Sequence, residues 1–179
     1  ELNFPELKYL LPVYYTLTMA EASSNLARYD GVRYGYRATG ARHLEDLYKR
    51  SRGEGFGKEV KRRIMLGTFI LSADYYDAYY TRAQRVRSVI MQKTEKFLED
   101  VDFLVSPTTP TPAFELGKKT QQAMESYLAD VFTVHANVTG LPAISIPNGK
   151  NGEGLPLGFQ VLGRLFGEKD LLNFAKSIE

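Results

Sequence analysis

The sequence contains no cysteine and only two histidines, His43 and His135. The absence of cysteine excludes disulfide scaffolds, thiolate zinc sites and cysteine nucleophiles. With two histidines, a histidine-rich metal centre is not expected, although carboxylate sites remain open. No apolar run approaches the ~18–20 residues that a membrane-spanning helix needs. We therefore expect a globular protein that does not act in a membrane.

The sequence also lacks a strong excess of either charge, with 23 basic and 21 acidic residues. This near balance does not by itself indicate a nucleic-acid-binding protein. Basic residues cluster at 58–63 and at 82–87, and we interpret both clusters as exposed helix faces. The length of 179 residues corresponds to about one domain of ~100–200 residues.

Hydrophobic spacing predicts helices in the first half and an alternation of strands and helices in the second, which is typical of an α/β fold. The predicted helices are 12–30, 58–71, 75–100, 121–138 and one that starts at Glu168; the predicted strands are 102–106, 143–147 and 157–163. Residues 31–57 are expected to form a long loop with one short helical stretch near 43–50. Three strands make a poor sheet alone, the chain does not start with Met, and it stops within a helical pattern. We therefore expect a fragment of a longer protein.

Several common catalytic motifs are missing: G-x-S-x-G, the phosphate loop G-x-x-x-x-G-K-[ST] and H-E-x-x-H. The glycine-rich stretch 53–57 follows no strand, so we interpret it as a flexible loop and not as a dinucleotide site. His43 and His135 have no recognisable triad partners, and a structural role is the better interpretation for both.

Two charged residues stand out as candidate ligand-binding groups. Arg63 flanks the apolar face of its helix, and Gly67 one turn later is predicted to leave space for a small ligand whose carboxylate the guanidinium could bind in a bidentate fork. Asp130 lies among apolar residues, where an unpaired carboxylate would be costly to bury. If the two converged on one pocket, they would suit the carboxylate and ammonium of a free amino acid. A surface arginine and an internally paired aspartate are the alternatives.

Seven stretches together resemble the A subunit of bacterial glutamyl-tRNA(Gln)/aspartyl-tRNA(Asn) amidotransferases, members of the amidase signature family. The resemblance extends over essentially the whole chain. The stretches are AEASSNLARYDGVRYG (20–35), KRRIMLGTF (61–69), YYDAYY (75–80), AQRVR (83–87), SPT (106–108), NVTGLPAISIP (137–147) and GLPLGFQ (154–160).

The resemblance implies a partial amidase-signature fold, with a mixed central sheet covered by helices and the N-terminal catalytic half missing. Residues 1–179 would be the C-terminal portion of a single amidase domain. The Ser–cis-Ser–Lys triad of the family has no counterpart here, so the chain alone is expected to be inactive. By resemblance, Arg63 would hold the glutamine carboxylate, Asp130 the α-amine, and Tyr14 would line the pocket.

The parent subunit would release ammonia from glutamine for ATP-dependent amidation of Glu-tRNA(Gln) or Asp-tRNA(Asn) in translation. The resemblance implies a cytoplasmic heterotrimer with B and C subunits, with misacylated tRNA bound mainly by the B subunit. This chain would need no cofactor, because ATP and Mg²⁺ would belong to the B subunit. Two alternatives stay open: a fragment of another amidase-signature hydrolase of small amides, and a binding or scaffold module without catalytic activity.

Overall fold

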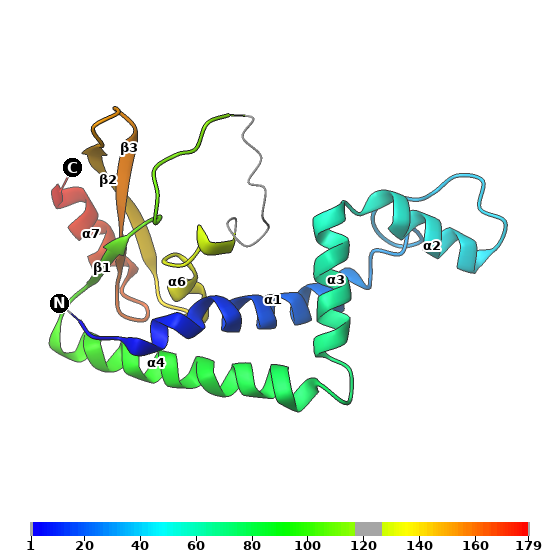
Figure 1. The fold of residues 1–179 in the computed structure, drawn as a ribbon, viewed down its shortest axis with the longest axis horizontal. Coiled ribbons are helices and arrows are strands. Elements are labelled where there is room, and N and C mark those ends of the chain that lie inside the picture. Colours follow the sequence, from blue (N-terminus) through cyan, green and yellow to red (C-terminus); the bar gives the residue numbers. More distant parts are fainter. Residues whose placement is uncertain (1, 117–126, 179) are drawn as a thin grey trace. The chain divides into compact units, whose positions relative to one another are not determined.

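The computed structural model describes residues 2–116 and 127–178 (Figure 1). The chain divides into two compact units, the first made of Glu1–Tyr14 with Arg85–Glu179 and the second of Tyr15–Gln84. Both boundaries fall within helices, because α1 spans Leu10–Leu26 and α4 spans Arg82–Asp100. Among the residues the structure describes, no helix is both long and apolar enough to cross a membrane.

A three-stranded sheet with the order β1-β3-β2 organises the first unit. The strands are β1 (Leu104–Pro107), β2 (Ala143–Lys150) and β3 (Pro156–Leu162), and β3 pairs antiparallel with both neighbours. On the central strand, the fully buried Val161 lies opposite Val105 and Ile144, and such β-branched residues suit a packed sheet. The three predicted strands and the α/β fold class are confirmed, and both strand pairs within the described ranges are antiparallel.

Helix α7 (Glu168–Ile178) packs against the sheet, as Figure 1 shows, and it begins where the sequence predicts. Its apolar residues recur at helical spacing, so that Leu171 and Ala175 are buried with Ile146 and Val161 of the sheet. At the margin of this core, the rings of Phe103 and Phe174 stack with their centroids 4.6 Å apart. This core therefore joins segments that are far apart in the sequence.

The two long predicted helices are present with shifted ends. The first is preceded by a 3-10 turn, η1 (Pro5–Tyr9), and α1 already ends at Leu26. The second starts as a π-helical turn, η2 (Asp77–Thr81), before it continues as α4. Arg164 donates hydrogen bonds from Nε to the Leu98 carbonyl (3.0 Å) and from Nη2 to the Val101 carbonyl (3.3 Å). A cation at this helix C-terminus satisfies carbonyls that have no partner within the helix.

The predicted long loop at 31–57 is only partly correct, because it contains a twelve-residue helix, α2 (Leu44–Gly55). Its ends are supported locally: His43 accepts a hydrogen bond from the Asp46 N–H at the N-terminus, and Arg50 pairs with Glu54 one turn later in the chain. Gly53 and Gly55 therefore lie in a helix, and the interpretation of 53–57 as a flexible loop is wrong for these two positions. The helix predicted at 58–71 is confirmed as α3 (Lys58–Ile70).

The predicted single helix 121–138 is only partly correct, because residues 127–128 and 134–138 are helical but a turn interrupts them. Its first part, residues 121–126, lies outside the described residues. Residues 129–133 form tight turns, in which the N–H groups of Asp130 and Val131 bond to carbonyls three residues earlier, and α6 (Val134–Thr139) follows. Thr133 strengthens this turn, because its hydroxyl donates to the Asp130 carbonyl at 3.2 Å. A hydroxyl that competes for backbone carbonyls favours a turn over a helix interior.

Candidate functional site

Arg63 lies in α3 and is half-buried. Its Nε atom donates to Glu59 Oε1 at 3.1 Å, and both side chains remain more than 40% exposed. An exposed ion pair at i,i+4 spacing stabilises a helix by only ~0.2–0.5 kcal/mol. The ion pair between Arg63 and Glu59 therefore contributes little to the stability of α3.

The predicted role of Gly67 is wrong, because the space next to it is occupied. A Cβ atom added at Gly67 would lie 1.9 Å from the Met19 carbonyl oxygen and 2.6 Å from the Ser23 Cβ. The glycine therefore allows the backbones of α1 and α3 to touch, and it leaves no room for a ligand. A hydrogen bond of 2.9 Å between the hydroxyls of Ser23 and Thr68 adds to this helix crossing.

Asp130 and Tyr14 both belong to the first unit and are half-buried. Asp130 lies on the turn that precedes α6 and not within a helix, and its carbonyl accepts the Val134 N–H at 3.1 Å. Tyr14 lies on α1. Arg63 belongs to the second unit, so the convergence of the three residues on one pocket stays a prediction.

Both histidines make contacts that suit structural roles. His43 is the N-cap of α2. His135 is partly buried in the first unit, where its Nε2 atom lies 2.9 Å from the Thr94 hydroxyl and its ring lies 5.6 Å from the Phe4 ring. Thr94 already donates its hydroxyl proton to the Ile90 carbonyl, so it accepts the hydrogen bond from His135. This arrangement requires a proton on Nε2, and burial of the ring favours the neutral tautomer that carries it.

His135 should make folding sensitive to acid. Burial lowers the pKa of its imidazole to about 4, below the ordinary 6.5, because the charged form is desolvated. The unfolded state therefore binds a proton before the folded state, and the free energy of unfolding should fall by roughly 3 kcal/mol as the pH drops from 6.5 to 4. Urea unfolding at several pH values measures this dependence. In His135→Gln that part of the pH dependence should disappear, and equal slopes for both proteins would contradict the assignment.

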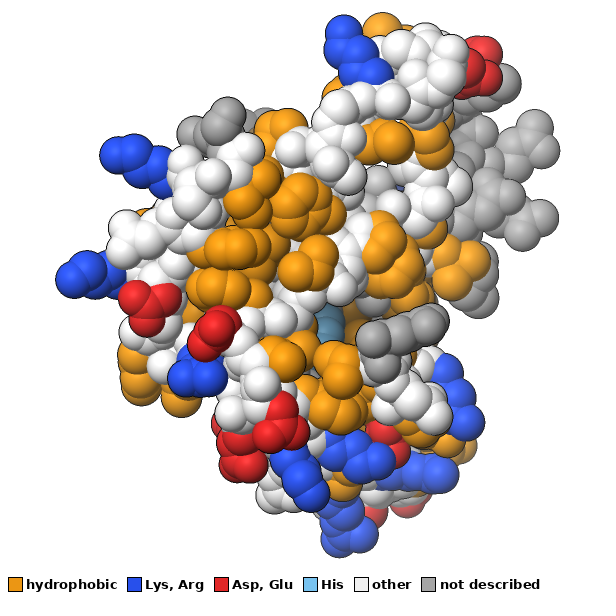
Figure 2. All heavy atoms as spheres, turned by 90° about the vertical axis from the view of Figure 1, so that its left-hand side faces the viewer, with side chains coloured by type: hydrophobic (Ala, Val, Ile, Leu, Met, Phe, Trp, Pro, Cys, Tyr) orange, Lys and Arg blue, Asp and Glu red, His pale blue; other side chains and the backbone are white. Residues whose placement is uncertain are grey.

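An apolar hollow of about 440 Å³ in the first unit was not predicted from the sequence. Figure 2, which views the side of Figure 1 where both termini lie, shows hydrophobic side chains gathered on this face with charged groups around them. The hollow is lined by Leu2, Phe4, Leu7, Phe97, Leu104, Val105, Ser106, His135 and Leu162. It contains none of the three predicted ligand-binding residues. Across residues 2–116 and 127–178, histidine and carboxylate side chains form no group of three that could hold a metal ion.

The chain belongs to the amidase family, since residues 1–172 match that family. It is 54% identical over all 179 residues to the A subunit of glutamyl-tRNA(Gln) amidotransferase from Parvibaculum lavamentivorans, and 54% identical to the same protein from Carboxydothermus hydrogenoformans. The chain covers 36% and 37% of these two relatives, or a little over a third of their length.

The solved structures agree with this assignment. The crystal structure of the glutamyl-tRNA(Gln) amidotransferase A subunit from Thermotoga maritima matches 99% of this chain with a TM-score of 0.69 and 38% identity, and the match covers 33% of that structure. Another solved amidase matches 94% of the chain, and 34% of its own length, with a TM-score of 0.66. At 23% identity this second match concerns the fold alone.

Proposed function

We propose that this chain is the C-terminal part of an amidotransferase A subunit, the part that shapes the glutamine pocket. The observation that carries the proposal is the identity of 50–54% to A subunits over the full length of the chain. The parent subunit would hydrolyse glutamine, and the released ammonia would amidate Glu-tRNA(Gln) or Asp-tRNA(Asn) in the cytoplasm. The Ser–cis-Ser–Lys triad would lie in the remainder of the subunit, so the 179 residues alone should release no ammonia from glutamine.

Within this proposal, each of the three residues has a defined task. Arg63 binds the glutamine carboxylate through its guanidinium, Asp130 pairs with the α-ammonium, and Tyr14 forms part of the pocket wall. No task requires a cofactor in this chain. ATP and Mg²⁺ would serve the B subunit, which also binds most of the tRNA, and a C subunit would complete the heterotrimer.

Replacing Arg63 with alanine in the full-length subunit tests the proposal. A hydrogen bond to a charged group contributes roughly 1.5–3 kcal/mol, so kcat/KM for glutamine should fall about tenfold or more, chiefly through a higher KM. Arg63→Lys should restore only part of the loss, because an ammonium cannot form the bidentate fork. Steady-state ammonia release in the assembled amidotransferase is the measurement.

Arg62 provides a matched control for this experiment. It is the neighbouring arginine, and its Nη1 atom pairs with the other oxygen of the same Glu59 carboxylate at 3.2 Å. Arg62→Ala therefore removes the same charge and a similar ion pair, and it should leave glutamine kinetics within about twofold of wild type. If both alanine variants had the same kcat/KM for glutamine, Arg63 would be an ordinary surface arginine with no role in glutamine binding.

A further inference from the structure

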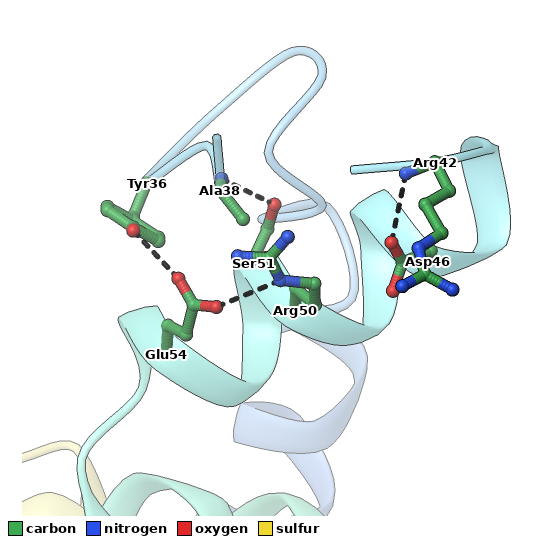
Figure 3. A network of polar contacts seen from close by, with 7 residues as sticks. All are labelled: Tyr36, Ala38, Arg42, Asp46, Arg50, Ser51 and Glu54. Carbon is green, nitrogen blue, oxygen red and sulfur yellow. Dashed lines mark hydrogen bonds and ion pairs between the residues drawn. The ribbon is translucent and has the colours of Figure 1, made fainter. Parts of the chain in front are cut away.

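The loop formed by residues 30–36, hereafter the 30–36 loop, is held in one conformation by α2. Figure 3 shows its two main supports. The Ser51 hydroxyl of α2 accepts the N–H of Ala38, two residues after the loop, at 3.0 Å, and the Tyr36 hydroxyl donates to Glu54 Oε2 at 2.8 Å. Arg50 binds the second oxygen of the same carboxylate at 3.2 Å. The bonds from Tyr36 and Arg50 lower the pKa of Glu54, so its charge persists into mild acid.

The backbone of the 30–36 loop is also held by hydrogen bonds and by close packing. Asp30 Oδ1 accepts the N–H groups of Val32 (2.8 Å) and Arg33 (3.1 Å), and these bonds lower the pKa of the Asp30 carboxyl. Gly31 has a φ of +80°, and a Cβ there would lie 2.4 Å from the Ser51 hydroxyl oxygen. Only glycine fits this position, because both the positive φ and the close approach exclude a side chain. The loop is thus preorganised and not a free connection.

The tip of this rigid loop presents large side chains to solvent. Val32 is 46% exposed and Tyr34 is 56% exposed. The Tyr34 ring packs next to the Tyr29 ring, with 6.1 Å between the two ring centroids. Arg33 is also exposed, and its guanidinium forms no ion pair with any residue in the described part of the chain. Tyrosine and arginine are enriched among the few residues that carry most of the binding energy of a protein interface, and binding costs less when such residues are held in place beforehand.

The charges around the loop favour a protein over RNA as its partner. The nearby arginines already have internal partners: Arg37 donates to the Gly31 carbonyl, Arg50 to Glu54, and Arg52 to the carbonyls of Leu26 and Tyr29. RNA affinity depends on several cations that can neutralise phosphates. Arg33 lies close enough to the Asp30 carboxylate to interact with its charge, and this carboxylate would repel phosphates.

We propose that the 30–36 loop is a protein-binding surface that inserts Tyr34 and Val32 into an apolar pocket of another chain. Arg33 pairs with a carboxylate at the rim of that pocket. This inference rests on the proposed function in one respect, because the companion B and C subunits of an amidotransferase are the probe. The loop lies in the second unit on a segment that contains none of Arg63, Asp130 and Tyr14, so it is separate from the predicted glutamine-binding residues.

The experiment measures the dissociation constant between a purified pair of B and C subunits and the full-length A subunit. Tyr34→Ala and Arg33→Glu should each raise this Kd by roughly 30-fold, the effect of losing one central interface residue. Two matched controls carry the same chemical changes on α2 or just before it: Leu44→Ala, at a side chain that is 59% exposed, and Arg42→Glu. Both controls should stay within about twofold of wild type, and thermal unfolding of each A-subunit variant before mixing verifies its fold.

The outcomes separate this inference from the function on which it rests. Failure of the wild-type A subunit to bind the companions would overturn both. If wild type binds and the loop variants bind equally well, only the inference is overturned. A loss of thermal stability at unchanged Kd would also overturn it, because the loop would then be covered by the rest of its own subunit. Weaker binding of misacylated tRNA by Arg33→Glu and Arg42→Glu, with the Kd for the companions unchanged, would assign the surface to RNA instead.

Discussion

Replacing Gly67 with alanine should lower the free energy of unfolding of the full-length subunit by about 3 kcal/mol or more. The new methyl group would lie 1.9 Å from the carbonyl oxygen of Met19, which is far inside van der Waals contact. That oxygen belongs to the backbone of α1 and cannot rotate away as the end of a side chain can. The two helices must therefore move apart, and separation exposes the core formed by Met19, Ala20 and Ile70. Overpacking of this kind typically costs 1–3 kcal/mol, and a rigid backbone neighbour places the site at the upper end.

Gly53→Ala is the matched control for the Gly67 variant. Gly53 also lies within a helix, but a Cβ there would meet nothing within 4 Å. Alanine should stabilise this helix by about 0.5–1 kcal/mol, because it loses less backbone freedom on folding than glycine. Urea unfolding gives both values from the transition midpoints. A Gly67 variant as stable as the Gly53 variant would show that α1 and α3 do not pack as described.

The helix α3 illustrates what the sequence predicts well and what it does not. Its apolar spacing predicts the helix and its bounds to within one residue. The same spacing places Gly67 on the apolar face, but it cannot tell whether a ligand or another backbone fills the space beside a missing side chain. That distinction depends on α1, which lies more than forty residues earlier in the chain. A local hydrophobic pattern predicts whether a segment is a helix or a strand. It does not predict which distant segment packs against it.

Two incorrect boundaries have local physical causes. The glycines at 53 and 55 favour a loop by propensity, but α2 extends through them because its N-cap and its ion pairs outweigh the cost of two glycines. Around Asp130 the opposite occurs: the apolar spacing favours a helix, while the Thr133 hydroxyl and tight backbone bonds produce a turn. In the first case side-chain capping and ion pairs override glycine propensity, and in the second a side-chain hydrogen bond and backbone turns override the hydrophobic pattern.

The candidate ligand-binding residues were predicted on two different grounds, their charge in an apolar setting and the family resemblance. Charge in an apolar setting was enough to single out Arg63 and Asp130, but it could not favour ligand binding over a structural role. The resemblance supplied those roles, and it alone pointed to Tyr14. The rigid conformation of the 30–36 loop was not predicted, because it depends on contacts with Ser51 and Glu54. Nothing in the local sequence distinguishes these two residues from other polar residues of a helix.

Asp130→Asn should reduce glutamine turnover by about 100-fold or more. If the carboxylate pairs with the α-ammonium of glutamine, asparagine keeps its size and removes only the negative charge. The ammonium would then enter a partly desolvated site without a counter-ion, and removal of one partner from such a pair costs ~3–5 kcal/mol when the pair is well buried. Asp130 is half-buried, so the lower part of this range applies. The backbone bonds that hold the turn use the Asp130 carbonyl and N–H, and the substitution leaves them intact.

The most direct test of the account compares two amides in the assembled amidotransferase that carries Asp130→Asn. One is glutamine, and the other is an amide of the same length without the α-amine. Ammonia release from each is measured as kcat/KM against wild type. We expect a loss of about 100-fold for glutamine and a loss of less than about threefold for the deaminated amide, which has no ammonium to pair. Equal losses for both amides, or no loss for either, would contradict the claim that this chain provides the site for the amino-acid part of glutamine.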